Sequence, residues 1–115
     1  LVVDLPPEEA ADFNRVVRAA GVDQVYLVAP NTSSERIASI CAQASGFVYF
    51  VAVKGVTGDK AVDLSVINAR IAETRQLSSL PVGIGFGIRT PQSAAAAAAS
   101  ADAVIVGSAL VEVVE

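Results

Sequence analysis

Apolar runs of strand length alternate along the whole chain with segments whose apolar residues recur at helical spacing. Each run is apolar at consecutive positions, and we expect strands at residues 1–5, 25–29, 47–53, 82–86 and 103–106. Strands that are apolar on both faces are typical of parallel sheets that are covered by helices or closed into barrels. The pattern therefore predicts an α/β fold of parallel strand–helix units, with residues 1–115 forming a single domain.

Helical segments follow the predicted strands. The first is expected to begin at Pro6-Pro7 and to end at Gly21, with an apolar stripe of Phe13, Val16, Val17 and Ala20. Thr32 and Glu35 have the spacing of a capping box for the second helix, which carries Ile37, Ile40, Cys41 and Ala44 at helical spacing. A third helix is expected at about residues 63–76, with Ile67 and Ile71 facing inward. A close-packed alanine helix is expected to begin at Thr90-Pro91, and a terminal helix at residue 108.

Composition and charge exclude several classes of function. The chain is 53% hydrophobic, only 17% charged and has a net charge of −4, so a surface for nucleic acid is not expected. Its apolar runs are too short to span a bilayer, and no basic segment precedes the first run. We therefore expect no membrane segment and no signal peptide, a chain that begins within a strand, and a cytoplasmic protein.

The titratable residues also limit the chemistry. The sequence contains no histidine, which excludes Ser-His-Asp and Cys-His catalysis and leaves no Cys/His cluster for a metal. Cys41, the single cysteine, lies on an apolar helical stripe and is expected to be a core residue and not a nucleophile.

Glycines gather where three of the predicted strands end, at Gly55-Val56-Thr57-Gly58, Gly85-Phe86-Gly87 and Gly107-Ser108. Ligands of parallel α/β folds bind beyond the carboxyl ends of the strands, and exposed N–H groups beside a helix start can hold an anion. The Ser108 hydroxyl could donate a further hydrogen bond to the same anion. Each glycine could equally be a turn residue, Thr57 a loop residue, Asp4 a structural acceptor, and Tyr49 a core residue.

The stretch "VGIGFGIRTP" (82–91) contains glycines of two kinds. Gly83 and Gly85 lie within the predicted strand, where we expect them to make room inside a crowded barrel. Gly87 lies beyond the strand end, where a phosphate could approach its N–H group. Only Gly87 therefore predicts function.

Three motifs in fixed order carry a family resemblance. They are "GFVYFVAVKGVTG" (46–58), "PVGIGFGIRTPQ" (81–92) and "ADAVIVGSALV" (101–111), and together they resemble the C-terminal part of the tryptophan synthase alpha chain. "LVVDLPPEE" and "VYLVAPNTSSERI" are similar to the preceding segments of that family. The resemblance implies a partial (β/α)8 TIM barrel with about five of its eight strands.

The resemblance also implies an activity and roles for particular residues. The family cleaves indole-3-glycerol phosphate to indole and glyceraldehyde 3-phosphate, and indole passes to a beta chain that holds PLP, so no cofactor is implied in this chain. The implied phosphate-binding residues are Gly58, Gly87, Gly107 and Ser108, and Thr57 would help to close the site. The implied substrate pocket comprises Tyr49, Phe86, Leu1, Val3, Leu27 and Ile105. The implied face toward the beta chain comprises Asp4, Pro6, Pro30 and Asn31.

The chain departs from the family pattern in one respect. The catalytic Glu and Asp of the family lie in the N-terminal half of the barrel, and neither Asp59 nor Asp102 matches them. These 115 residues alone are therefore expected to lack useful lyase activity. An alternative is a non-enzymatic half-barrel whose open edges bind another copy or a separate N-terminal half. A flavodoxin-like receiver domain also suits the length, but Asp4 stands alone where that class needs an acidic pair.

Overall fold

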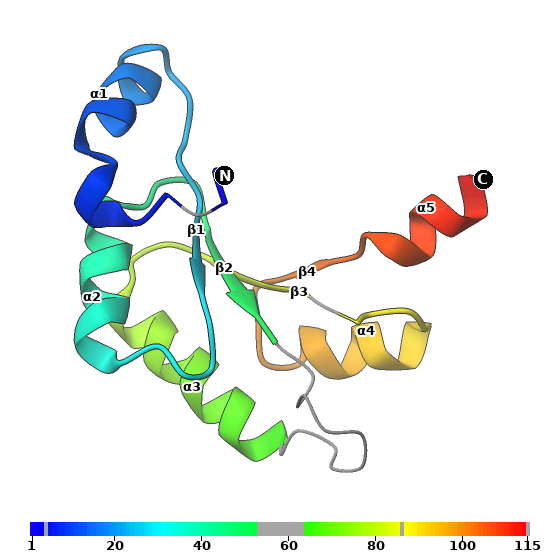
Figure 1. Cartoon of the computed structure of the whole chain (residues 1–115). Helices are drawn as coiled ribbons and strands as arrows, with labels where there is room; N and C mark the ends of the chain where they lie inside the picture. The colour runs from blue at the N-terminus through cyan, green and yellow to red at the C-terminus, as the bar shows by residue number, and fades with distance from the viewer. Residues whose placement is uncertain (4, 53–63, 86, 115) are drawn as a thin grey trace.

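A four-stranded parallel sheet forms the centre of the molecule (Figure 1). The computed structural model describes residues 1–3, 5–52, 64–85 and 87–114. In this part the strands follow the order β1-β2-β3-β4, with bounds β1 Tyr26–Val28, β2 Val48–Val51, β3 Val82–Gly85 and β4 Ala103–Ile105. The prediction of parallel strands near residues 25–29, 47–53, 82–86 and 103–106 is confirmed, with shorter bounds.

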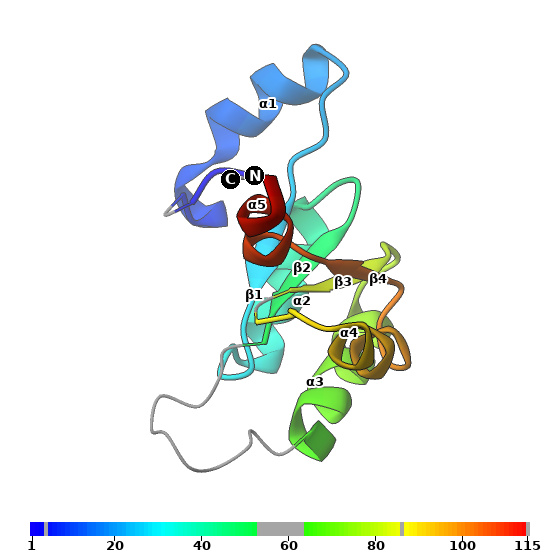
Figure 2. The ribbon, with the colours of Figure 1, turned by 90° about the vertical axis from the view of Figure 1, so that its right-hand side faces the viewer.

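Helices connect successive strands, as parallel pairing requires. A short 3₁₀ helix, η1, covers Pro7–Glu9, and the α-helices are α1 Ala11–Ala19, α2 Ser34–Gln43, α3 Leu64–Leu77, α4 Pro91–Ala98 and α5 Ser108–Val114. In Figure 1, α2, α3 and α4 lie along one side of the sheet. In the turned view of Figure 2, α3 and α4 lie close together beside β3 and β4, and α1 stands clear of the sheet.

The strand register separates the two faces of the sheet. Paired residues of parallel strands point to the same side, so one face collects Tyr26, Val28, Val48, Phe50, Val82 and Ile84. These side chains are buried with Ile37 and Ile40 of α2 and Ile67 and Ile71 of α3, which form the core. The inward orientation predicted for Ile67 and Ile71 is confirmed. The opposite face, called the open face below, carries Leu27, Tyr49, Val51, Gly83, Gly85 and Ile105.

The prediction of a strand at residues 1–5 is wrong for the described residues of that run. Leu1, Val2 and Val3 form no strand and are 49%, 40% and 64% exposed. Among the described strands, β1 pairs with β2 only. A strand needs ladder hydrogen bonds to a neighbouring strand, and the described residues of this run pair with none of the described strands, although Val2 and Leu5 line a cavity with Leu27 of β1. The described sheet therefore has four strands where five were expected.

The first helical segment also differs from its prediction. It is divided into η1 and α1, and the predicted stripe is not buried: Phe13 and Val16 are 40% and 64% exposed. Ala10 and Asn14, one helical turn apart, are buried instead, and Asn14 Nδ2 donates to the Tyr26 hydroxyl at 2.7 Å. Periodicity shows which residues share a face of a helix, but a neighbouring element decides which face is covered.

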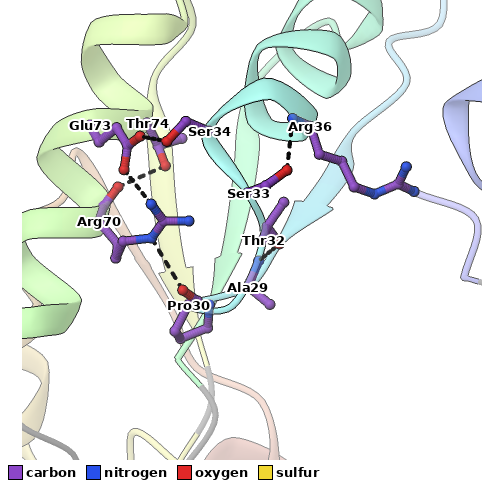
Figure 3. Close-up of polar contacts among 9 residues, drawn as sticks. All are labelled: Ala29, Pro30, Thr32, Ser33, Ser34, Arg36, Arg70, Glu73 and Thr74. Carbon is purple, nitrogen blue, oxygen red and sulfur yellow. Dashed lines mark hydrogen bonds and ion pairs between the residues drawn. The ribbon is translucent and has the colours of Figure 1, made fainter.

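The N-cap of α2 is Ser33 and not Thr32. Ser33 Oγ accepts from the Arg36 backbone N–H at 3.2 Å, while Thr32 Oγ1 accepts from the Ala29 N–H at 2.9 Å and closes the turn after β1 (Figure 3). Consecutive hydroxyl residues can all serve as caps, and the extended backbone immediately before the first helical turn selects one of them. The predicted start of α4 is confirmed, because Thr90 caps it in a capping box with Ser93.

The alanine helix α4 packs less closely than predicted. None of its residues is buried, although Ala97 contacts the core. A cavity of about 310 Å³ lies beside it, lined by residues that include Ile67 and Asn68 of α3 and Ala96 and Ala97 of α4. Methyl side chains let a helix approach a sheet, but they are too short to fill the space between two helices.

Candidate functional site

The strand glycines make room for side chains on the open face. A Cβ atom added at Gly83 would lie 3.0 Å from Ile105 Cδ1. One added at Gly85 would lie 2.7 Å from Tyr49 Cζ, closer still to the Tyr49 hydroxyl, and 3.2 Å from Ile105 Cβ. The phenol of Tyr49 therefore lies directly over Gly85. The prediction that these glycines provide space is confirmed.

A cavity of about 340 Å³ opens where β3 and β4 end. It is lined by Tyr49, Gly87, Ile88, Arg89, Ile105, Gly107 and Ser108. Neighbouring parallel strands place their carboxyl ends at the same edge of a sheet, so turns far apart in sequence meet here. The cavity thus brings together two residues assigned to the substrate pocket, Tyr49 and Ile105, with three assigned to phosphate binding, Gly87, Gly107 and Ser108.

The two glycines of this cavity have open space around them. Gly87 has a φ of +67°, which favours glycine, and a Cβ built on it would meet no atom within 4 Å. A Cβ built on Gly107 would also meet no atom within 4 Å. Both residues are exposed. Their backbones are therefore accessible to a ligand, in contrast to the backbones of Gly83 and Gly85, which lie beneath side chains.

Arg89 lines the cavity and was not among the candidate residues from sequence. Its Nη2 lies 2.5 Å from Glu112 Oε2 of α5, and the side chains are 53% and 56% exposed. Its backbone N–H donates to Ser93 Oγ of α4 at 3.3 Å. A cation two positions beyond Gly87 was the sequence signal that could have identified it.

The other apolar pocket candidates lie elsewhere. Leu27 and Pro6 line a second cavity of about 540 Å³ near β1, together with residues that include Leu5, Arg36 and Val51. Leu27 is the register partner of Tyr49, so both belong to the open face. Leu1 and Val3 are exposed and line neither cavity. The candidate substrate pocket is therefore divided between two cavities in the described structure.

The turn after β1, which holds Pro30 and Asn31 of the candidate partner face, is attached to α3 (Figure 3). Arg70 Nε donates to the Pro30 carbonyl oxygen at 3.1 Å, and Arg70 Nη1 pairs with Glu73 Oε2 at 2.5 Å. The Ser34 hydroxyl donates to the other carboxylate oxygen of Glu73. Asn31 is exposed. Helix α3 therefore holds the turn in place while Asn31 remains accessible.

Comparison with known proteins shows the family of this chain. The family model of the tryptophan synthase alpha chain matches residues 1–115. This chain belongs to that family. The alpha chain of Halorhodospira halophila is 55% identical over 114 residues, and that of Alkalilimnicola ehrlichii is 54% identical over 111. The matches include 99% and 96% of this chain but 42% and 40% of the relatives, so the chain spans about two fifths of their length.

Solved alpha chains have the same arrangement of strands and helices. The alpha subunit of Campylobacter jejuni superimposes with a TM-score of 0.88 at 32% identity, over 96% of this chain and 45% of that one. The alpha subunit of Legionella pneumophila gives 0.81 at 40% identity, over 96% and 40%. These neighbours are TIM barrels, so the prediction of a partial barrel is confirmed. Barrel helices lie outside the strands, which identifies the open face as the side that faces the barrel interior.

Several candidate residues lie outside the described part of the alpha-chain segment. They are Asp4, Thr57, Gly58 and Phe86. Within the described ranges, no group of three or more His, Cys, Asp or Glu side chains is placed to hold a metal, and no helix combines the length and apolar character needed to cross a bilayer.

Two titratable groups outside the cavity have pKa values shifted from their ordinary range. Burial raises the pKa of the Cys41 thiol, which opposes formation of the nucleophilic thiolate. Cys41 is half-buried and packs against the core, so it lies at the edge of the core and not within it as predicted. The pKa of the Glu8 carboxyl is lowered, mainly by a hydrogen bond from the Glu8 backbone N–H and secondly by a hydrogen bond from Arg36. Arg36 Nη1 lies 2.6 Å from Glu8 Oε1.

Proposed function

We propose that this chain supplies the phosphate-binding part of a tryptophan synthase alpha chain, a lyase that cleaves indole-3-glycerol phosphate to indole and glyceraldehyde 3-phosphate. The cavity at the ends of β3 and β4 carries this proposal. It combines accessible backbone at Gly87 and Gly107 with the Ser108 hydroxyl, and it places Tyr49 beside them. A phosphate needs several donors that converge on its oxygen atoms, and an aromatic ring beside that point suits a ligand that also contains indole.

Each part of the substrate is assigned to residues of this chain. The N–H groups of Gly87 and Gly107 and the Ser108 hydroxyl bind the phosphate, with Gly58 as a further donor and Thr57 closing the site. Tyr49, Phe86, Leu27 and Ile105 form apolar wall for the indole ring, with Leu1 and Val3 at its margin. No residue between 1 and 115 is assigned to proton transfer. Because positioned acids and bases contribute about 10²–10⁴-fold each, the 115 residues alone are expected to be inactive.

Partner binding and location complete the proposal. Asp4, Pro6, Pro30 and Asn31 form the face toward a beta chain, which holds PLP, so this chain binds no cofactor of its own. The attachment of Pro30 to α3 supports this role, because it presents the turn in one conformation without covering Asn31. The chain acts as one domain in the cytoplasm and contacts neither nucleic acid nor membrane.

A hybrid barrel tests the proposal. In the alpha chain of Halorhodospira halophila, the matching 114-residue segment is replaced by this chain. The hybrid barrel is expected to cleave indole-3-glycerol phosphate and to restore growth of a tryptophan-requiring bacterium that lacks the alpha chain. A folded hybrid without activity would contradict the proposed function. Cleavage by the 115-residue chain alone, at the rate of a complete barrel, would contradict the assignment of the catalytic groups to other residues.

Substitution within the hybrid barrel tests the phosphate site separately. Gly87→Val and Gly107→Val place side chains in space that is now empty, where the phosphate is proposed to bind. Both variants are expected to lose affinity for glycerol 3-phosphate, measured by isothermal titration, while their circular dichroism remains that of the parent. Unchanged affinity in a folded variant would place the phosphate elsewhere.

A binding or assembly module is the second candidate function, and the open face favours it. Leu27 on that face and Phe13 and Val16 on α1 are exposed apolar side chains, and β1 pairs on one side only within the described sheet. Such a module is expected to dimerise or to bind a separate N-terminal barrel half. Light scattering that shows a stable, soluble monomer at high concentration would contradict it.

A further inference from the structure

We propose that Arg89 is an additional phosphate-binding residue of this cavity, whose guanidinium exchanges Glu112 for the phosphate group of the ligand. The inference rests on the proposed function because it concerns the same site. It adds a cationic side chain to a site otherwise built from backbone N–H groups and one hydroxyl. The ligand class that it selects is a phosphate monoester dianion.

Both ends of the Arg89 side chain are placed by the structure. Its backbone lies in the β3–α4 connection and donates to Ser93 Oγ, which also takes part in the capping box of α4. Its guanidinium reaches α5, where it pairs with Glu112. The side chain therefore extends from one wall of the cavity to the helix that begins at Ser108 on the other wall.

The charge around the cavity indicates which kind of ligand gains from Arg89. Of the described residues that line the cavity, Arg89 is the only charged one. The chain as a whole has a net charge of −4, which repels a dianion at long range. A cation in the cavity offsets this repulsion at the point where the phosphate is proposed to bind.

The ion pair with Glu112 is weak enough to be exchanged. Both side chains are more than half exposed, and exposed ion pairs change an equilibrium by about fivefold at most. A guanidinium can instead form two parallel hydrogen bonds to a phosphate that carries twice the charge of a carboxylate. Glu112 thus competes with the ligand for Arg89 and holds the side chain near the cavity while no ligand is bound.

A purely structural ion pair predicts a different outcome, which makes the two roles separable. If the pair serves only to hold α5, loss of either partner should have the same effect. If Arg89 binds the phosphate, loss of Arg89 should weaken binding, while loss of Glu112 should strengthen it by removing the competitor. Opposite signs for the two substitutions are the signature of the proposed exchange.

The experiment titrates inorganic phosphate and glycerol 3-phosphate into the hybrid barrel at low and high salt. Arg89→Gln is expected to weaken binding by about tenfold or more and to reduce its dependence on salt, and Arg89→Lys to retain part of the affinity. Glu112→Gln is expected to strengthen binding by about twofold to fivefold. The matched control is Arg75→Gln, which removes the same charge from a pair with Asp102, the residue before β4. Neither residue lines the cavity, so affinity should be unchanged.

Each result supports or overturns the inference. Affinity that is unchanged in Arg89→Gln but lost in Gly107→Val would overturn the role of Arg89 and leave the proposed function intact. A hybrid barrel that binds no phosphate would overturn both. Equal weakening by Arg89→Gln and Glu112→Gln would show a structural pair only. If Arg89→Gln does not fold, Glu112→Gln decides, because it retains Arg89: binding that is not strengthened overturns the exchange.

Discussion

Adding one methyl group at Gly85 is expected to destabilise the sheet through a contact with Tyr49. Gly85 lies on β3, beneath the phenol ring that β2 places over it. The Cβ of Gly85→Ala would be 2.7 Å from Tyr49 Cζ and 3.2 Å from Ile105 Cβ. Carbon atoms that are not bonded prefer about 3.5–4.0 Å, so at least one of these side chains must move.

The magnitude follows from two opposing effects. Replacing glycine by alanine at a permitted backbone position stabilises a protein by about 0.4–1 kcal/mol, because the unfolded chain loses freedom. Overpacking a core typically costs about 1–3 kcal/mol. To admit the methyl group, the Tyr49 ring must leave its position over Gly85 and lose its packing there, while Ile105 Cβ, fixed directly to the backbone of β4, can shift little. The steric cost prevails, and we expect the free energy of unfolding to fall by about 1–2 kcal/mol.

A double-mutant cycle isolates this contact. The free energy of unfolding is measured by urea denaturation of the chain, followed by far-ultraviolet circular dichroism. In a Tyr49→Ala background, Gly85→Ala should cost about 1 kcal/mol less than in the parent, because the ring is absent. Gly87→Ala is the matched control: its positive φ costs about 1–2 kcal/mol in either background, and no atom lies within 4 Å of its Cβ.

Additive effects of the two substitutions would contradict a contact between Tyr49 and the added methyl group. If Gly85→Ala costs the same in both backgrounds to within about 0.5 kcal/mol, the Tyr49 ring is not the source of the destabilisation. A stabilising effect of Gly85→Ala in the parent would show that the ring and Ile105 accommodate the methyl group without cost. Either result would mean that the Tyr49 ring does not require glycine at position 85.

Three further predictions concern groups away from the cavity. Tyr26→Phe removes the acceptor of the Asn14 side-chain amide and is expected to cost about 1–3 kcal/mol in urea denaturation; a neutral effect would show that the hydrogen bond is dispensable. Ser33→Ala removes the N-cap of α2 and should cost about 1 kcal/mol, whereas an unchanged unfolding midpoint would assign the cap to another residue. Burial raises the pKa of Cys41 above its ordinary value of 9.0, so alkylation by iodoacetamide at about pH 8 should be slower in the folded chain than in urea. The unfolded chain loses the thiol proton first, so the free energy of unfolding should decline as the pH rises above 9.0. Equal alkylation rates would contradict this shift.

Much of the fold could be predicted from sequence because it depends on local patterns. The apolar runs that became β1 to β4 carry their own strand signal, and Ile67 and Ile71 mark the buried face of α3 through spacing alone. The parallel order of strands follows from the helical connections, because a helix between two consecutive strands returns the chain to the same end of the sheet beside the previous strand. The family was also recognisable, because its three glycine motifs occur in a fixed order along the chain.

The predictions that were wrong depended on a neighbour that local sequence does not specify. The apolar run at residues 1–5 has strand composition, but its described residues form no strand and Leu1, Val2 and Val3 remain exposed. The stripe containing Phe13 and Val16 is correctly placed on one side of α1, yet Asn14 faces Tyr26 instead. In each case the residues carry the apolar pattern, but packing in the folded chain decides whether that pattern is covered.

Local residue patterns were sufficient to predict the strand–helix alternation, the parallel class of the sheet and the glycines that end its strands. The shared cavity of Tyr49, Gly87 and Ser108, and the place of Arg89 in it beside Glu112, became visible only in the folded chain. The physical reason is a difference of range. Helix and strand preferences are set by residues a few positions apart, whereas a binding site is formed by the ends of strands that are distant in sequence and adjacent only after the sheet has formed.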